Sequence, residues 1–493
     1  MSDIYIPGVK SRFDSEKIIE DLMRLERVPR ERATNTVERL ETEKGYWQEI
    51  SSRTNDLRES ARLLFSFQNP FNDRTVSSSN DSVLIGTAVR DALEQERSFT
   101  VKQTAQADRF LSAPLDDDFM VESGTYTFSV GSDEISFEFK GGTVKDFSEA
   151  LNRRSRDKLQ SSIITIKPGS KSLLIESKIT GEENRLGFAG AALALGEAIG
   201  MVEQVQDDPL GLRPLNAVSR AQDAIVSMEG IEVQRPTNEI NDLIPGVTIT
   251  ARKASELPVT IQVETDRENI KDAIITMVGN YNRLMAEINV LTRYDDRVVD
   301  ELSYLTKEEK DDYRKKLGAF SGDSSLTQIR NSLMRIVNTP YPNSEEWDLT
   351  LLAQIGVGTD VRRSGGTDVS RLRGYLEIDE KVLDAAIASK LPAIKQLFGS
   401  DTSGDLLVDT GLAYSIDTLT RPYTESTGLF AQKAGNMTMR IDQEKRRIET
   451  LDRQLAVKEA DLKKQYSQME GAYSRMEQMS ASFGRFQQQN SNY

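Results

Sequence analysis

Two stretches of the sequence come closest to the spacing of a known chemical site. Asp116, Asp117 and Asp118 are consecutive carboxylates, and carboxylate oxygens are the ligands that Ca²⁺ and Mg²⁺ prefer. They lack the alternating spacing of a calcium loop, so we interpret them as a solvated linker. The glycines from Gly187 to Gly200 resemble a phosphate loop, but no Gly-Lys-Ser/Thr follows them. We therefore predict no catalytic residue, no metal site and no cofactor.

The composition narrows the function further. The chain of 493 residues has no cysteine and no histidine, which removes thiolate nucleophiles, disulfides, most zinc sites and the commonest general base. A hydrolase built on two carboxylates about 5 Å apart would remain possible, but nothing in the sequence locates such a pair. The formal charge of −15 argues against a nucleic-acid partner, which requires a basic footprint.

Targeting signals are also missing from the sequence. Residues 1–9 are too short and too polar for the apolar core of a signal peptide. The long apolar stretch Leu186–Val202 is interrupted by glycines and Glu197, and it falls short of the roughly 20 residues that span a bilayer. We expect no membrane span. If the protein is exported, it leaves without a cleaved signal peptide.

A seven-residue apolar repeat runs toward the C-terminus. Such a repeat indicates a helix with one narrow seam that needs a partner. A companion row is less regular, which favours weak pairing or pairing only on assembly. The seam residues are Ile448, Leu455, Leu462, Met469, Met476 and Phe483.

The N-terminal segment offers a partner for this seam. Residues 15–67 have helical periodicity, with Ile18, Leu22 and Leu25 on one apolar face beside Ile19. Pro29 predicts two helices or one kinked helix, because proline lacks an N–H and clashes with the preceding turn. We predict that these three residues, together with the seam, form an assembly interface.

The period changes to two between about Thr75 and Glu264. A hairpin is predicted around the polar turn at 131–133, between Tyr126–Val130 and Ile135–Phe139. A second hairpin is predicted around Glu229–Gly230. A helical period returns at Thr265 with a capping-box pattern, Thr265-x-x-Glu268.

Helices also follow the β-rich region. Apolar residues step by four and three from Ile270 to Leu291, which predicts a bundle helix. Shorter helices are predicted over Leu326–Ile336 and over Val382–Phe398, the latter punctuated by Pro392. Ser364–Thr367 is predicted to be a loop.

These patterns predict an α+β protein. We expect an elongated chain in which paired terminal helices and a helical stem bracket inserted β-rich head domains. The predicted divisions are an N-terminal leg (1–45), a stem (46–78 with 266–435), a head (79–120 with 212–265), an outermost head (121–211) and a C-terminal coiled-coil leg (436–493).

Several motifs resemble the flagellar filament cap family, also called hook-associated protein 2. Gly8–Asp14 resembles the family's opening segment, although Arg12 replaces its second glycine. The strongest resemblance is Pro245-Gly246-Val247-Thr248 with its upstream residues. The other matching residues are Asp223-Ala224-Ile225, Gly230, Arg235, Asn238, Ile240, Asp242, Asn280-Tyr281-Asn282, Gly322-Asp323, Ile355-Gly356-Val357, Leu376, Ile378 and Asp379.

The resemblance implies a structural role without catalysis. Members of the family form an annular, pentamer-like homo-oligomer at the filament tip, where they retain exported flagellin and promote its polymerisation. The implied partners are further copies of the chain, flagellin, hook–filament junction proteins and an export chaperone. The implied location is the flagellar tip, outside the cell or in the periplasm if the flagella are internal.

Two other functions fit the same layout. A secreted surface adhesin or a type III needle-tip-like protein shares the cysteine-free, helix-bracketed plan, and an enzyme with carboxylate chemistry is a third possibility. Loss of filaments after deletion, with flagellin shed into the medium, would select the cap. Normal filaments with lost adhesion would select the adhesin.

Overall fold

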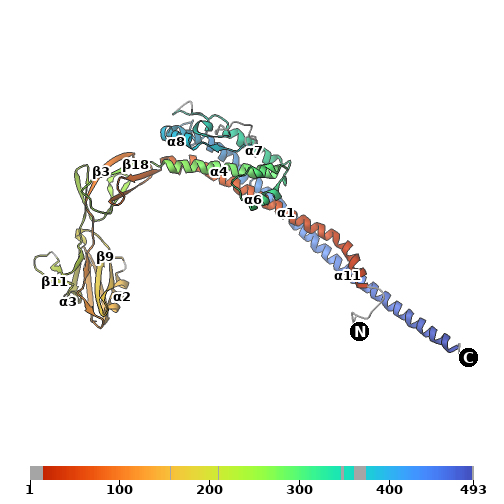
Figure 1. Cartoon of the computed structure of the whole chain (residues 1–493), viewed down its shortest axis with the longest axis horizontal. Coiled ribbons are helices and arrows are strands. Elements are labelled where there is room, and N and C mark those ends of the chain that lie inside the picture. The colour runs from red at the N-terminus through yellow and green to blue at the C-terminus, as the bar shows by residue number, and fades with distance from the viewer. Residues whose placement is uncertain (1–14, 156, 209, 346–348, 360–372, 491–493) are drawn as a thin grey trace. The chain divides into compact units, whose positions relative to one another are not determined.

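The computed structural model describes residues 15–155, 157–208, 210–345, 349–359 and 373–490, with no side chains given beyond Gly484. The chain divides into two compact units, residues 1–69 with 271–493 and residues 70–270 (Figure 1). The predicted α+β class is confirmed, because a β-rich region is inserted between helical segments. The predicted motif at Gly8–Asp14 and the predicted loop at Ser364–Thr367 lie outside the described residues.

The first unit is helical. It contains most of α4 and two short strands that pair with each other. Its elements are α1 (Ser15–Phe65), α4 (Arg267–Thr292), α5 (Arg297–Asp300), α6 (Lys307–Lys316), α7 (Ser324–Val337), η3 (Leu352–Ile355), β19 (Val357–Gly358), β20 (Glu377–Ile378), α8 (Glu380–Ser389), α9 (Leu391–Phe398), α10 (Leu412–Thr424) and α11 (Leu429–Asn490).

Helix α1 continues through Pro29, so of the two predicted alternatives the division into two helices is wrong and a single helix is found. Met23 and Ala33, on either side of the proline, are both buried on the same face. Burial on both sides holds the segment in one helix, because apolar packing outweighs the loss of one backbone hydrogen bond. Thr34 hydrogen-bonds back to the carbonyl of Arg30 within the same stretch (Oγ1 to O 3.0 Å).

The bundle pattern of α4 is confirmed, but its predicted cap is wrong. The apolar residues from Ile270 to Leu291 are buried at the predicted spacing. Thr265 is the last residue of a strand, paired with Arg74, and its hydroxyl donates to Glu94. The Asp266 carboxylate instead accepts from the Asn269 N–H at 3.0 Å. Strand pairing therefore moves the helix start one residue onward, where Asp caps as well as Thr.

Two shorter helices in this unit, α7 and α8, begin at capping carboxylates. Asp323 accepts from the N–H groups of Ser325 and Leu326 at the start of α7, and Asp379 does the same for α8. The predicted helix over Val382–Phe398 is divided at Lys390 into α8 and α9, with Pro392 in the first turn of α9, where a missing N–H costs little.

The second unit contains an antiparallel sheet in the order β1-β18-β3-β14-β15 and a three-stranded sheet β16-β17-β2. One apolar core, with Phe99, Val226, Ile249 and Ile261 at its centre, draws residues from both sheets. The strands are β1 (Arg74–Ser78), β2 (Leu84–Ala88), β3 (Gln95–Gln103), β14 (Ala224–Met228), β15 (Ile231–Arg235), β16 (Glu239–Ile244), β17 (Val247–Ala251) and β18 (Val259–Thr265).

A second core in this unit gathers three further sheets. The orders are β10-β6-β7, β13-β4-β9-β5 with β8 paired to β9, and β11-β12. The elements are β4 (Arg109–Leu111), β5 (Leu115–Asp116), β6 (Met120–Val130), β7 (Asp133–Thr143), α2 (Val144–Arg154), β8 (Leu159–Lys167), β9 (Ser170–Ser177), β10 (Leu186–Gly190), α3 (Ala191–Ala198), β11 (Val202–Gln204), β12 (Leu212–Pro214) and β13 (Ala217–Ser219). The short 3₁₀ turns η1 (Pro70–Asn72) and η2 (Glu182–Asn184) complete the unit.

Both predicted hairpins are confirmed. β6 pairs with β7 across Gly131–Ser132, and β14 pairs with β15 across Glu229–Gly230. Glu229 and Gly230 both have positive φ, as a two-residue hairpin turn of type I′ requires. Phe110 and Leu212 pack in the second core, although we placed them in the other head domain. The predicted domain boundaries therefore stay a proposal.

A buried charge cluster joins three helices of the first unit. The Glu287 side chain on α4 is fully buried and pairs with the Lys316 ammonium of α6 at 3.1 Å, and Lys316 also pairs with Glu49 of α1. Burial raises the pKa of the Glu287 carboxyl, and the Lys316 charge opposes that rise. The ammonium lies 4.6 Å from the ring centroid of Tyr313. The cluster fastens α6 to α1 and α4.

Replacing Lys316 tests this cluster. We expect Lys316→Met to destabilise the protein by about 3 kcal/mol at neutral pH, because it leaves a buried carboxylate without its cation. A carboxyl whose pKa is raised in the folded state contributes fully to the stability of the protein at low pH. That contribution is lost as the pH rises through the raised pKa. The defect should therefore shrink as pH falls toward 4.5, the ordinary pKa of the carboxyl.

Urea unfolding at several pH values measures this effect. Lys307→Met, which removes an exposed lysine from the same helix, serves as the control and should change stability little. A pH-independent loss in Lys316→Met would contradict the assignment.

Candidate assembly interface

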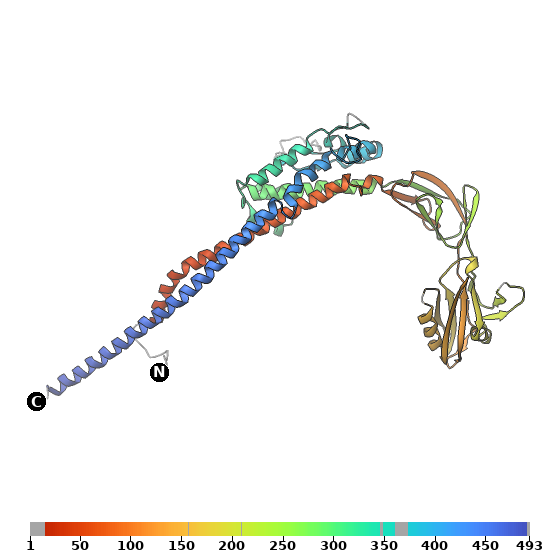
Figure 2. The same ribbon diagram turned by 180° about the vertical axis from the view of Figure 1, so that it is seen from behind.

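Helices α1 and α11 lie side by side and run antiparallel (Figures 1 and 2). Val37 and Leu40 of α1 pack with Ile441 of α11 in a small apolar core, and Ile448 extends it. Ile19 and Met23 continue the same face of α1 toward its N-terminal end and are also buried. This packing brings the first described residues of the chain next to the C-terminal helix.

Polar contacts across the pair set its register. Arg30 pairs with Asp452 at 3.0 Å (Nε to Oδ1), and Lys445 pairs with Glu41 at 2.8 Å (Nζ to Oε1). Each exposed pair contributes only about 0–1 kcal/mol, so these contacts select one alignment instead of supplying most of the stability. Two further contacts are Lys458 with Glu26 at 3.8 Å and the Ser15 hydroxyl with the Glu470 carboxylate at 2.5 Å.

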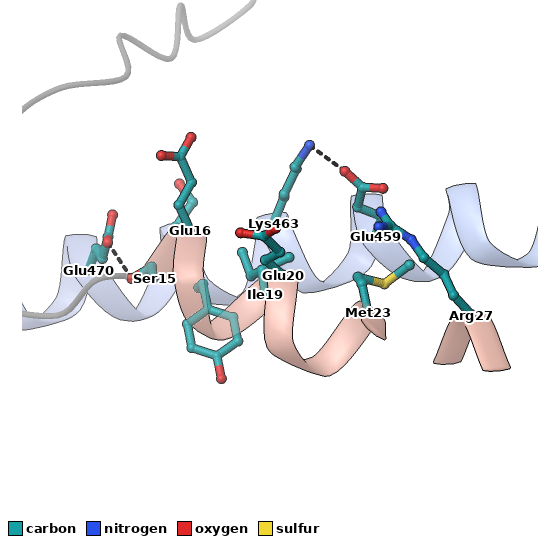
Figure 3. A pocket seen from close by; sticks show the side chains of 11 residues that line it. Ser15, Glu16, Ile19, Glu20, Met23, Arg27, Glu459, Lys463 and Glu470 are labelled. Atoms are coloured by element: carbon teal, nitrogen blue, oxygen red, sulfur yellow. Dashed lines mark hydrogen bonds and ion pairs between the residues drawn. The ribbon is translucent and has the colours of Figure 1, made fainter. Parts of the chain in front are cut away.

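A pocket of about 750 Å³ lies between the two helices near the start of α1 (Figure 3). Lys463 and Glu459 of α11 form an ion pair at its rim, 2.7 Å apart. The hydrogen bond from Lys463 lowers the pKa of the Glu459 carboxyl. The lining residues are Ser15, Glu16, Ile19, Glu20, Met23, Arg27, Glu459, Lys463, Tyr466, Ser467 and Glu470.

The pocket is lined by apolar side chains such as Ile19 and Met23 and by charged groups of both signs. Among the described residues we find no cluster of three or more carboxylates that could hold a metal ion. A carboxylate and an ammonium beside apolar side chains are suited to binding another polypeptide surface, where apolar contact supplies affinity and charge supplies orientation.

An apolar stripe continues along α11 beyond the paired region. All described side chains from Gly471 to Gly484 are exposed. Met476 is 64% exposed and Phe483 is 74% exposed. Met469, Tyr473, Met476, Met479 and Phe483 follow one another at spacings of four, three, three and four residues, which places them on one face of the helix. The stripe is therefore an exposed apolar surface.

The structure divides the predicted seam into two parts. Ile448, Leu455 and Leu462 are half-buried, whereas Met469, Met476 and Phe483 are exposed. Tyr466 and Glu470 are half-buried on either side of the exposed Met469, because a straight helix drifts by about 20° per heptad relative to a seven-residue repeat. Met469 therefore turns away from α1, whereas Met476 and Phe483 lie beyond the first described residue of α1, which contacts Glu470.

The predicted residues of α1 lie beside its buried face. Ile18, Leu22 and Leu25 are exposed, and Leu25 is the most exposed of them at 69%. Sequence reasoning missed Met23 and Ala33, which are buried instead. The signal was present in the spacing of four and three residues that connects Ile19 and Met23 with Val37 and Leu40. Whether the predicted interface residues bind a partner stays a prediction.

Residues of the sequence motifs hold turns and junctions. The Asn282 side chain donates to the Leu376 carbonyl and accepts from the Leu376 N–H, both at 2.8 Å. Asn238 makes the same two-way contact with Ala105. Arg235 forms a two-pronged pair with Asp242.

Two further motif residues act locally. Gly246 has a φ of 75° in the turn between β16 and β17, where an L side chain would be strained. Asp323, besides capping α7, pairs with Lys433 of α11 at 2.9 Å. These motif residues therefore stabilise turns and junctions of the fold.

The fold defines a class of protein: a helical protein with long terminal helices and an inserted β-rich part. The chain matches the sequence family described as flagellar hook-associated protein 2, its N-terminus over residues 11–108 and its C-terminus over residues 221–478. The chain belongs to the flagellar hook-associated protein 2 family.

Relatives cover nearly the whole chain. It is 31% identical to flagellar hook-associated protein 2 of Treponema maltophilum, over 92% of this chain and 94% of the relative. It is 27% identical to that of Treponema pallidum, over 90% and 93%. The A-type protein of Pseudomonas aeruginosa is 28% identical, over 96% and 95%.

The fold is also similar to a solved structure. A crystal structure of the flagellar cap protein FliD from Escherichia coli matches with a TM-score of 0.56 at 20% identity. The match covers 80% of this chain and 99% of that chain. In the described part of this chain, none of the helices is both long and apolar enough to cross a bilayer.

A pair of leucines in α1 tests the helix packing. We expect Leu40→Ala to destabilise the protein by about 2–5 kcal/mol, because Leu40 is buried against α11. Leu25→Ala should change stability by less than about 0.5 kcal/mol in the isolated protein, since Leu25 is exposed. Urea unfolding followed by circular dichroism measures both. Equal effects of the two substitutions would contradict the assigned face.

Proposed function

We propose that this protein is the structural cap at the distal end of a bacterial flagellar filament. In this proposal several copies form a ring that retains exported flagellin and promotes its polymerisation. Family membership supports the general role. The observation that carries the assembly step is the apolar stripe of Met469, Tyr473, Met476, Met479 and Phe483, which remains exposed in the single chain.

The stripe supplies a driving force for docking. Burying one large apolar side chain contributes about 1.5–3 kcal/mol to the free energy of association. A few of these residues therefore offset part of the entropy lost when two molecules associate. Methionine adapts its shape to different neighbours, because its side chain is unbranched and flexible. A cap that advances with a growing lattice must bind non-equivalent sites, and a methionine-rich stripe suits that requirement.

The proposal includes the partners that the resemblance implies. They are further copies of this chain in a pentamer-like ring, flagellin, hook–filament junction proteins and an export chaperone. Export without a cleaved signal peptide would deliver the protein to the filament tip, outside the cell or in the periplasm. Ile18, Leu22 and Leu25 of α1 would add a second apolar face to the docking surface.

The other candidate functions have less support. The comparisons give no support to a surface adhesin or a needle-tip-like protein. The family is a structural one, and the motif residues that resemble it hold turns and helix starts in this chain. We therefore propose a structural function without catalysis.

Charges placed on the stripe test the proposal. We expect Met469→Asp with Met476→Asp to leave the fold intact, because both positions are exposed in the single chain. The double variant should fail to join the filament tip, because burying an unpaired carboxylate is costly. Electron microscopy of filament ends, with and without added protein, measures capping.

Met439→Asp is the matched control. Met439 is as exposed as Met476 and lies on the same helix, but outside the stripe. This variant should cap filaments normally. Normal capping by the double variant would show that the stripe is not the docking surface.

A further inference from the structure

Three glutamates, with Arg27 between the first two, lie along one side of α1 in the paired region, which we call its acidic face. Glu20, Glu31 and Glu38 are exposed, and each follows a residue that turns toward α11. Their spacings of 11 and 7 residues are close to three and two helical turns, so the three carboxylates lie in line. Among the described residues we find no ion pair or side-chain hydrogen bond to these carboxylates.

The outer side of α11 is basic at the same level. Arg446 and Arg453 each lie two residues before a half-buried seam residue, and Lys464 lies two residues after one. Two residues correspond to about 200° around a helix, so this face points away from α1. All three are exposed, and the one side-chain contact found for them in the described residues is from Arg453 to the carbonyl of Glu449.

The charged residues of the two faces lie at matching positions along the axis of the helix pair, which we call their height. The spacings on α11, read backward from Lys464, are again 11 and 7 residues. The contacts of Glu26 with Lys458 and of Arg30 with Asp452 fix the antiparallel register. In that register Lys464 is level with Glu20, Arg453 with Glu31, and Arg446 with Glu38.

Intervening residues at equal heights do not repel one another. Arg27, between Glu20 and Glu31, is level with the apolar Val457. Thr34 is level with Thr450. When the face of α11 in a second helix pair lies against this face of α1 at the same height, opposite charges therefore meet at three levels. Like charges do not meet at any of the five levels named.

We propose that the acidic face of α1 binds the basic face of α11 in a second copy of this chain. Rotation about an axis parallel to the helices leaves each residue at its own height, so ring symmetry brings the matching charges together. The contact is heterologous, since two different faces meet, and such contacts generate a ring when the rotation between copies closes. This inference rests on the proposed ring and identifies the surface through which neighbouring copies recognise each other.

The charges mainly determine how neighbouring copies align along the helix axis. An exposed ion pair contributes little to affinity, whereas like charges facing each other are strongly unfavourable. A slip of one helical turn would separate the matching charges. The contact would therefore fix the height at which neighbouring copies bind, while apolar surfaces supply the affinity.

Charge reversal on the full-length chain tests the proposal. The first variant carries Glu20→Lys, Glu31→Lys and Glu38→Lys, and the second carries Arg446→Glu, Arg453→Glu and Lys464→Glu. We expect each to self-associate roughly tenfold more weakly or worse at low salt, because like charges then meet. The variant with all six changes restores opposite charges and should regain self-association. Sedimentation velocity measures the assembly.

The controls separate the possible outcomes. Glu134→Lys, Glu239→Lys and Glu256→Lys give the same change in net charge as the first triple variant, at exposed positions of the other unit, and should leave assembly unchanged. Circular dichroism and thermal unfolding verify that each variant is folded. At about 1 M salt, where the Debye length is about 3 Å, the differences should diminish.

Three results would overturn the inference. The first is normal assembly of both triple variants, and the second is failure of the six-fold variant to recover. The third is loss of filament capping with self-association intact, which would assign the charges to a filament subunit. If the unaltered protein forms no oligomer either alone or on filament ends, the proposed ring fails together with this contact.

Discussion

The antiparallel register of α1 on α11 is the constraint on which the rest of the interface depends. Apolar packing of Val37 and Leu40 against Ile441 holds the helices together, and the pair of Arg30 with Asp452 selects one alignment. That alignment ends the paired region at Ser15 and Glu470, so the exposed stripe begins where the described part of α1 stops. It also sets the acidic and basic faces at equal heights. A shift by one turn would alter both surfaces.

The family motifs and the assembly surfaces are separate features of this chain. Motif residues such as Asn238, Asn282 and Asp323 bond to backbone groups at junctions, which explains how they stabilise the fold of this chain. The candidate contact surfaces consist instead of exposed side chains on two long helices. A likeness in motifs therefore identifies the fold and family, whereas partner recognition must be derived from the faces of α1 and α11.

Local patterns predicted much of the fold. The hairpin around Glu229–Gly230 and the buried face of α4 follow from short-range periodicity and turn chemistry. The start of α4 did not, because pairing of Thr265 with Arg74 is a long-range contact that no local pattern reveals. The site was predicted in part. Two neighbouring rows on α1 are both apolar, and only the position of α11 decides that Met23 is buried and Leu22 is exposed. A strict seven-residue repeat in the sequence also does not reveal the angular drift of the helix, which turns Met469 away from α1.

Hydrogen exchange of the backbone, compared between the free protein and the protein bound at filament tips, tests the central claim most directly. The account predicts slow exchange across residues 441–462 in both states, because this part of α11 is packed on α1. Residues 471–484 should exchange quickly in the free protein and become strongly protected at the tip. Unchanged fast exchange of residues 471–484 in the bound state would contradict the claim that the exposed end of α11 is an assembly surface.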